Sequence, residues 1–361
     1  MVKIKYPKDR KKFEEDYKKI FYKKNGEWYN FEKNIDCCVR RIFTKHKIKS
    51  LNDLLIAPFD VLLELFNAFP PEKIKKNKDG KKIYSSYDKY IKYFKYDGDN
   101  QQNISKFFMK NSKVLKLNTC YFCNIDYINS FTITPLELLN NAKMNILKDK
   151  VDGIGKEKAK KIIDYRKNKI ITYQNLEEDK ILTRKIIKKV KNSKIEANHF
   201  TLDHFLPKGK CPILSLSLYN FVPSCYACNS TFKGVDELLK THLSPTSKDF
   251  SVDTDIKFKL YNKGDFIDEK FTLALECNKE VEQYVQTFKL RGRYKFHEKI
   301  AEDIIQKQKQ YPNSKIHEMA SLLGIPFQQI KNDIFGKELF DETIAVQENS
   351  FTKLKRDILK L

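Results

Sequence analysis

Apolar and aromatic residues recur at helical spacing through the first third of the chain. Aromatic side chains are set among lysines in FEEDYKKIFYKK and YDKYIKYFKY, and the run LNDLLIAPFDVLLELFNAF is strongly apolar. Pro70 and Pro71 end that run, and KIKKNKDGKK is typical of an exposed loop. We therefore predict a helical N-terminal region over residues 1–115. It is suited to packing or to binding a partner, but its sequence contains no pattern that indicates a catalytic or metal-binding site.

The final section of the chain begins with an alternating pattern and continues with a helical one. DIKFKLYN and FTLALE alternate polar and apolar residues, and NKGDFIDEK between them contains turn residues, which predicts a β-hairpin. Residues 250–361 are therefore expected to form a β-hairpin followed by helices. Within them Ala320, Gly324 and Ile330 have helix-turn-helix spacing, with Pro326 in the turn. Helical hairpins with such residues are also common in protein cores.

Two cysteine pairs of identical spacing lie in the middle of the chain. Cys120 and Cys123 are separated by two residues, and so are Cys225 and Cys228. This spacing lets both thiolates of a pair turn onto one ion. Two such pairs complete a tetrahedral zinc site with no open position, so the predicted zinc is structural. The other cysteines lack such pairing and are interpreted as core or free thiols: Cys37, Cys38, Cys211 and Cys277.

The start of the chain and its hydropathy favour a cytoplasmic protein. No apolar run approaches the ~18 residues that a membrane span needs. The basic start MVKIKYPKDRKKFEEDYKK lacks the apolar segment of a signal peptide. Reduced cysteines are expected in the cytoplasm, where paired CxxC spacings indicate a metal site rather than disulfides.

The charge balance favours a polyanionic partner. Lys and Arg number 70 against 47 Asp and Glu, a net charge of +23. Nucleic acid is the obvious candidate, because each neutralised phosphate releases counterions. A lysine-rich coding bias is the alternative, since it raises the charge without a function.

Polar residues in a distinctive order lie between and beside the cysteine pairs. HFTLDHFLPK is followed by SLYNFVPSCYACNSTFKG. The order Asp203-His204, then Asn220, then Asn229 directly after Cys228 resembles the HNH endonucleases. It is most similar to the zinc-braced branch that includes phage recombination endonuclease VII. LDHFLPK and NFVPSCYACNS also resemble HNH proteins of bacterial antiphage systems.

This resemblance implies both a fold and a reaction. It covers residues 117–129 and 200–234, and it implies an α+β protein whose zinc-braced ββα-metal core occupies residues 116–134 and 197–249. The implied reaction is hydrolysis of a phosphodiester bond that leaves a 5′-phosphate. A shared role in antiphage defence would imply a companion protein such as an ATPase.

The residues of this motif suit that chemistry. A hard divalent ion can polarise the phosphate and relieve charge on the leaving oxygen. Asp203 offers a carboxylate, and the resemblance makes Asn229 a second ligand, which suits Mg²⁺ or Mn²⁺. His204 can accept a proton from water, and the resemblance gives Asn220 the role of holding the loop between two strands. Adjacent strand residues point to opposite faces, so Asp203 and His204 converge only where the strand bends or ends, which Pro207 favours.

Residues 135–196 separate the cysteine pairs and contain a further pattern. Gly153-Ile154-Gly155, followed by Ala159 and an aliphatic pair, resembles the helix-hairpin-helix motif. The glycines allow a tight turn, and the N–H groups that start the next helix favour a phosphate. Such a contact grips the backbone of duplex DNA without reading its sequence. A plain glycine turn is the alternative, and TYQNLEEDKILTRKIIKKVKN is a candidate second unit without Gly-Ile-Gly.

We therefore predict a metal-dependent endonuclease that acts on nucleic acid, with duplex DNA as the expected substrate. The predicted DNA contacts are Gly153, Ile154, Gly155, Lys156, Lys158 and Lys161 in the insertion, with Lys208 and Lys233 beside the HNH motif. A non-catalytic zinc module that binds nucleic acid and scaffolds a partner is one alternative, which Asp203 and His204 argue against. A ribonuclease on structured RNA is the other, and the Gly-Ile-Gly hairpin argues mildly against it.

Overall fold

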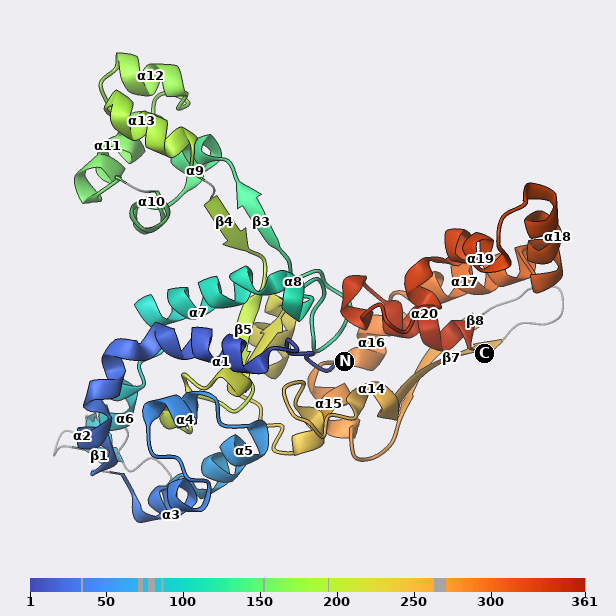
Figure 1. The fold of residues 1–361 in the computed structure, drawn as a ribbon, viewed down its shortest axis with the longest axis horizontal. Coiled ribbons are helices and arrows are strands. Elements are labelled where there is room, and N and C mark those ends of the chain that lie inside the picture. The colour runs from blue at the N-terminus through green and yellow to red at the C-terminus, as the bar shows by residue number, and fades with distance from the viewer. Residues whose placement is uncertain are drawn as a thin grey trace. The chain divides into compact units, whose positions relative to one another are not determined.

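The computed structural model shows an α+β protein made of helices and two-stranded sheets (Figure 1). It describes residues 1–33, 35–70, 74–76, 82–85, 88–151, 153–193, 195–262 and 271–360. The chain forms two compact units. The first joins Met1–Asn129 to Phe200–Leu361, and the second is Ser130–His199. No helix in the described part of the chain is long and apolar enough to cross a membrane.

The N-terminal part of the first unit is helical, as its sequence pattern predicts. Its helices are α1 (Arg10–Lys18), η1 (Lys19–Glu27), α2 (Trp28–Glu32), α3 (Cys37–Lys45), α4 (Leu51–Leu55), α5 (Phe59–Ala68), α6 (Asp88–Tyr93), α7 (Asp99–Lys110) and α8 (Ser112–Leu115). Ser50 caps α4, because its side chain accepts a hydrogen bond from the amide of Asp53. The segment predicted as an exposed loop instead contributes to an antiparallel pair, β1 (Ile74–Lys76) with β2 (Lys82–Ser85). Its central residues 77–81 lie outside the described residues.

A hairpin of strands β5 (Thr201–His204) and β6 (Phe221–Ser224) forms the middle of the first unit. The strands are antiparallel, and His204 pairs with Phe221 at the end of the hairpin. Short helical turns fill the connection and follow it: η2 (Pro212–Leu214), η3 (Leu218–Asn220), the π-helix η4 (Ala227–Lys233) and η5 (Thr241–Leu243). The π-helix η4 packs against β5. Single π-helical turns of this kind are rare and often occur at functional sites.

The C-terminal part begins with the predicted β-hairpin. Strands β7 (Ile256–Asn262) and β8 (Phe271–Cys277) pair along their full length, and the residues between them, 263–270, lie outside the described residues. The remaining elements are helical: α14 (Val252–Asp255), α15 (Glu282–Thr287), α16 (Leu290–Lys295), α17 (Glu298–Gln310), α18 (Asn313–Leu323), α19 (Phe327–Phe335), η6 (Lys337–Leu339), η7 (Val346–Glu348) and α20 (Thr352–Leu359). The predicted helix-turn-helix segment is the α18–α19 pair, with Gly324 at the end of α18.

One hydrophobic core joins the three parts of the first unit. Phe122, beside the first cysteine pair, stacks on Phe288 of the C-terminal part with ring centroids 4.4 Å apart. Phe59 of α5 meets the edge of Phe205, which follows β5, at 5.3 Å. Residues 1–115 therefore contribute side chains to the same hydrophobic core as the rest of the first unit. The sequence pattern could not show this, because it marks a face as buried without naming what covers it.

The second unit has its own core and contains the segment expected as an insertion. It begins with β3 (Ser130–Ile133) and ends with β4 (Ile195–Asn198), which pair antiparallel, Ser130 opposite Asn198. Between them lie α9 (Pro135–Asn141), α10 (Met144–Lys150), α11 (Lys156–Arg166), α12 (Tyr173–Glu178) and α13 (Arg184–Lys191). Thr134 caps α9, and Thr172 with Asn175 forms a capping box at α12.

The four helices α10 to α13 form two hairpins with the same burial pattern. Gly155 is the N-cap of α11 and Thr183 is the N-cap of α13. The buried residues at matching distances from these caps are Ile154, Ala159 and Ile162 in the first hairpin and Leu182, Ile187 and Val190 in the second. Each turn also contains a residue with positive φ, Gly153 in the first and Lys180 in the second. The second hairpin thus exists without the Gly-Ile-Gly sequence.

Candidate functional site

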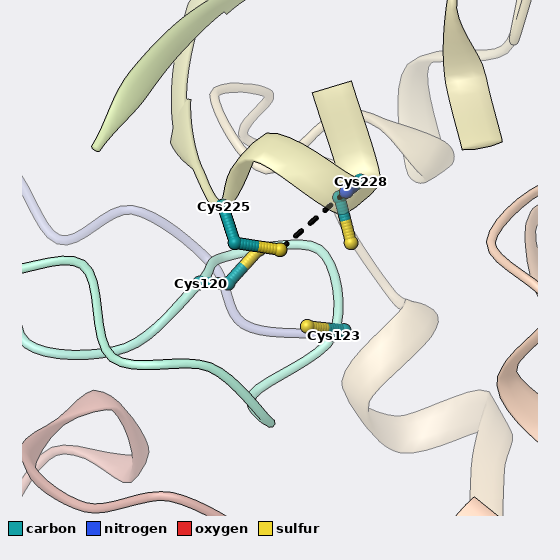
Figure 2. A group of neighbouring side chains, drawn as sticks. All are labelled: Cys120, Cys123, Cys225 and Cys228. Carbon is teal, nitrogen blue, oxygen red and sulfur yellow. Dashed lines mark hydrogen bonds between the residues drawn. The ribbon is translucent and has the colours of Figure 1, made fainter. Parts of the chain in front are cut away.

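The two cysteine pairs come together in one buried cluster (Figure 2). The Sγ atoms of all four residues lie within 4.8 Å of one another. Backbone turns orient them: the amide of Ile125 donates to Sγ of Cys123, and the amide of Cys228 donates to Sγ of Cys225, both at 3.4 Å. In Figure 2 the side chains of Cys120, Cys123, Cys225 and Cys228 point toward a common centre.

This donor set fits one metal ion, and zinc is the ion that such a set favours. Four sulfur ligands complete a tetrahedral shell, which leaves no position for water or substrate. The two pairs come from segments about 100 residues apart in the chain, before and after the second unit. A metal held here would therefore fix the start of η4 to the turn that contains Cys120 and Cys123.

Arg293 of α16 supports the cluster and is not marked by any sequence motif. Its guanidinium donates to Sγ of Cys228 at 3.1 Å, to Sγ of Cys123 at 3.5 Å and to Asp126 at 3.0 Å. The side chain is 16% exposed. Four thiolates around Zn²⁺ carry a net negative charge, which the guanidinium offsets. Partners of this kind raise metal affinity by orienting the ligands and tuning their charge.

Replacing Arg293 by methionine is expected to weaken zinc binding by roughly 10–100-fold, because the thiolates lose their cationic partner. Competition with a chromogenic zinc chelator measures this. The zinc affinity of Arg293→Lys should lie between those of the unsubstituted protein and Arg293→Met, since lysine keeps the positive charge but not the paired N–H donors of the guanidinium. Arg291→Met is the matched control, because Arg291 on the same helix pairs with Glu282. Equal zinc retention in all four proteins would show that the contact is only structural.

His204 lies at the end of β5 with its imidazole held by neighbours. Its Nε2 lies 2.9 Å from the carbonyl oxygen of Ser215, so Nε2 is the donor and Nδ1 the acceptor of the neutral ring. The ring meets the edge of Tyr96 at 4.5 Å and tilts against Phe221 at 4.8 Å. Burial lowers the pKa of His204 to about 3, against the opposing hydrogen bond to Ser215. The ring is therefore neutral at neutral pH, and Nδ1 is its acceptor atom.

Asn220 holds the connection between β5 and β6. Its Oδ1 accepts from the amide of Leu206 at 2.8 Å, and its Nδ2 donates to the carbonyls of Leu206 and Leu214 at 3.0 and 3.2 Å. The side chain is fully buried. These bonds hold both ends of the segment from Leu206 to Leu214, and Ser215, whose carbonyl contacts His204, follows directly.

Asp203 is buried and forms an ion pair with Lys233. The Lys233 ammonium lies 3.2 Å from Oδ1 and 3.1 Å from Oδ2 of Asp203, and it donates to the carbonyl of His204 at 3.1 Å. Burial raises the pKa of Asp203, and Lys233 opposes that shift. In this structure the Lys233 side chain is 0% exposed and its charge is paired, so the predicted contact of Lys233 with DNA would require the lysine to move and stays a prediction. The sequence gives no sign of this burial.

Asn229 and Lys208 come from the two segments on either side of the hairpin strand β6 in the sequence. Asn229 lies in η4, which packs against β5, and its backbone amide donates to the carbonyl of Cys225 at 3.1 Å. Lys208 is partly exposed, pairs with Asp97 at 2.9 Å and lies 4.6 Å from the centre of the Tyr96 ring. Tyr96 thus contacts both Lys208 and His204 and comes from the N-terminal part of the unit.

The glycine turn of the second unit has the geometry expected from its sequence, with one correction. Gly153 has φ +87°, which glycine adopts without strain. Lys156 is exposed, whereas Lys158 is half-buried and its ammonium donates to the carbonyl of Gly153 at 3.1 Å. Ile154 is 3% exposed and belongs to the core, so its predicted DNA contact is wrong for the side chain. Lys161 is exposed.

Comparison of the chain with family models, with known proteins and with solved structures finds no match. The four cysteines form a closed cluster that could hold one metal ion, and the Lys233 ammonium joins the buried carboxylate of Asp203 to the backbone carbonyl of His204, whose imidazole is held by the Ser215 carbonyl.

Proposed function

We propose that the protein is a metal-dependent endonuclease that hydrolyses phosphodiester bonds in nucleic acid, with duplex DNA as the substrate. The observation that carries the proposal is His204, a neutral imidazole whose Nε2 is occupied by a carbonyl and whose Nδ1 can take a proton. It directly follows Asp203, a buried carboxylate, in β5, and the hairpin of β5 and β6 leads into the four-cysteine cluster. The order of these residues, which resembles the HNH endonucleases, supports the same conclusion.

The residues divide the work of hydrolysis between them. Nδ1 of His204 takes the proton of the attacking water, and the Ser215 carbonyl stabilises the charge that the ring then gains. Asn220 keeps that carbonyl in place. Lys208 is positioned to meet a phosphate oxygen, because it is partly exposed beside Tyr96 and His204. A zinc ion in the cysteine cluster braces the hairpin and takes no part in the chemistry.

Asp203 and Asn229 are the residues that would hold the catalytic Mg²⁺ or Mn²⁺. Their donors are hard oxygens, which such ions prefer. Oδ2 of Asp203 is buried and has no hydrogen bond among the described residues, but the Lys233 ammonium lies 3.1 Å from it, so an ion could bind this oxygen only in place of that ammonium. The bound ion would polarise the phosphate and relieve charge on the leaving oxygen.

We propose that the second unit is the part of the protein that binds DNA. Between Ser130 and His199 the chain has 17 lysines and arginines against nine acidic residues, a net charge of +8 in 70 residues. The starts of α11 and α13 present backbone N–H groups of the kind that bind phosphate. Two hairpins of matching pattern favour a backbone contact that is independent of base sequence.

A cleavage assay tests the proposal. Labelled duplex DNA, single-stranded DNA and structured RNA are incubated with the zinc-loaded chain and Mg²⁺ or Mn²⁺. The expected result is ion-dependent cutting of duplex DNA that Asp203→Asn abolishes. Cutting of RNA alone would favour a ribonuclease. Tight binding without cutting of any substrate would favour a scaffold, whereas equal cutting by Asp203→Asn would exclude Asp203 from the reaction. The resemblance to antiphage proteins also makes a companion ATPase a partner to include in the assay.

Reversing two charges at the glycine hairpin separates gripping from cutting. Lys156→Glu with Lys161→Glu removes two exposed cations near the start of α11. Duplex affinity should fall equally for all sequences, and the slope of log affinity against log salt should decrease by roughly 0.9 for each phosphate that the protein no longer neutralises. Cleavage at saturating DNA and low salt should persist, because His204 is untouched.

The matched control for this prediction changes the same charge at the other end of α11. Lys167 and Lys169 pair with acidic residues there, and both are exposed. Lys167→Glu with Lys169→Glu should leave the salt slope nearly as it is. An unchanged slope in the Lys156 and Lys161 variant would mean that this hairpin does not contact DNA, while the nuclease proposal would stand.

A further inference from the structure

We propose that Lys233 is an internal counter-ion that closes the metal site at Asp203 and leaves that carboxylate when the divalent ion binds. This inference rests on the proposed function, since it concerns the same carboxylate. It adds a gate that the order of motif residues does not contain. Lys233 thereby becomes a positioning residue of the site instead of a surface contact to DNA.

The contacts of Lys233 are all directed inward. Its ammonium donates to Oδ1 of Asp203 and to the carbonyl of His204, and it lies 3.1 Å from Oδ2 of Asp203. The side chains of the pair are 0% and 3% exposed. The ammonium also lies 5.8 Å from the centre of the Phe205 ring. Lys233 therefore occupies the carboxylate that a divalent ion would need as a ligand.

A divalent ion and this ammonium cannot share Asp203. Two cations at contact distance in a partly buried site repel each other strongly, since water screens them poorly. The ion can bind the carboxylate only if the lysine moves. While the ion is absent, the lysine neutralises the negative charge of the buried Asp203 carboxylate. Without either cation, that carboxylate would be a buried unpaired charge, which is costly in free energy.

Two features distinguish a replaceable partner from a permanent structural ion pair. First, Oδ2 of Asp203 has the Lys233 ammonium at 3.1 Å but no hydrogen bond in the described part of the chain, although buried acceptors are normally hydrogen-bonded. Second, Lys233 is the last residue of the π-helix η4, and Gly234 follows with φ +50°. A Cβ built at Gly234 would meet no heavy atom of the described residues within 4 Å, so there is space beside the backbone next to the lysine.

The gate has a consequence for substrate binding. A nucleic acid brings phosphate oxygens, which are ligands for the ion and also partners for a displaced ammonium. Ion and substrate should therefore favour each other, because both stabilise the open state in which Lys233 has left Asp203. When neither the ion nor the nucleic acid is bound, Lys233 stays paired with Asp203 in the closed state.

Binding of Mn²⁺ to the zinc-loaded full chain tests the gate without any cleavage. Free Mn²⁺ is followed by its paramagnetic resonance signal during titration. Lys233→Met should bind Mn²⁺ more tightly than the unsubstituted protein, by roughly tenfold or more, because a competing cation is gone. Lys210→Met, which removes an exposed lysine that pairs with Glu237, is the matched control and should change affinity little. Asp203→Asn should lose the site. Equal or weaker binding by Lys233→Met would overturn the proposal.

A second measurement uses the unsubstituted chain, so it does not depend on a variant folding. Amines are acetylated with and without saturating Mn²⁺, and each lysine is read by mass spectrometry. Lys233 should be protected without the ion and become labelled with it, whereas Lys208 should be labelled in both. Continued protection of Lys233 with bound Mn²⁺ would rule out displacement. If Mn²⁺ exposes Lys233 but no nucleic acid is cleaved, displacement of the lysine is supported and the nuclease proposal fails. If nucleic acid is cleaved but Lys233 stays protected, the nuclease proposal is supported and displacement of the lysine fails.

Discussion

Replacing His204 by alanine is expected to lower the rate of duplex cleavage by about 10²–10⁴-fold, the usual contribution of a general base. The chain then lacks the acceptor Nδ1, whose availability follows from the bond between Nε2 and the Ser215 carbonyl. Zinc content and DNA affinity should remain, because neither the cysteine cluster nor the second unit is touched. Rates under single-turnover conditions at saturating DNA measure the effect.

Two controls decide whether the effect comes from the imidazole itself. His199→Ala removes an exposed histidine just before β5 and should keep the full rate. Thermal unfolding of His204→Ala shows whether loss of the ring disturbs Tyr96 and Phe221, which pack on it. A well-folded His204→Ala protein that cuts DNA at the normal rate would exclude His204 as the base.

Replacing Cys225 by serine is expected to remove the zinc and to unfold the first unit. Purified protein should hold about one zinc per chain, and the variant much less. Structural zinc contributes on the order of 10 kcal/mol to folding, while a domain is stable by only about 5–15 kcal/mol. The loss is therefore comparable with the whole stability of a domain, so the first unit is expected to unfold. Elemental analysis and thermal unfolding of the same samples measure both effects.

Cys211→Ser is the matched control, since Cys211 is also buried but lies outside the cluster. It should keep one zinc per chain and a cooperative transition. The second unit, whose core is separate, should keep its helical signal even in Cys225→Ser. Zinc content that does not change in Cys225→Ser would contradict the assignment of the four cysteines.

The sequence predicts the parts of the site that depend on local spacing. Two residues between cysteines determine that both sulfurs turn the same way, so the pairing of Cys120 with Cys123 and of Cys225 with Cys228 could be predicted directly. The same holds for the turn at Gly153, because positive φ and glycine go together. The second hairpin was harder to predict, since Lys180 takes the positive φ there without a glycine to mark it.

The parts that depend on distant packing could not be predicted. Arg293 lies 65 residues after Cys228, and no pattern connects α16 to the cluster. Tyr96 reaches His204 from a region that the sequence shows only as helical. The partner of His204 at Ser215 is a backbone carbonyl, which any residue type supplies. The inward direction of Lys233 follows from the geometry of η4, and a lysine in sequence suggests an exposed side chain instead.

The pairing of β3 with β4 has a consequence for how the protein folds. A metal site that joins Cys123 to Cys225 must close a loop of 102 residues, of which Ser130–His199 makes up 70. If the second unit folds first on its own core, Ser130 and Asn198 already lie side by side, and the effective loop shortens to about a third. The entropy cost of closure then falls by about 1 kcal/mol. The helical hairpins are thereby inserted between the zinc ligands at little cost, and the strand pair at their base makes the two halves of the first unit near neighbours before the metal arrives.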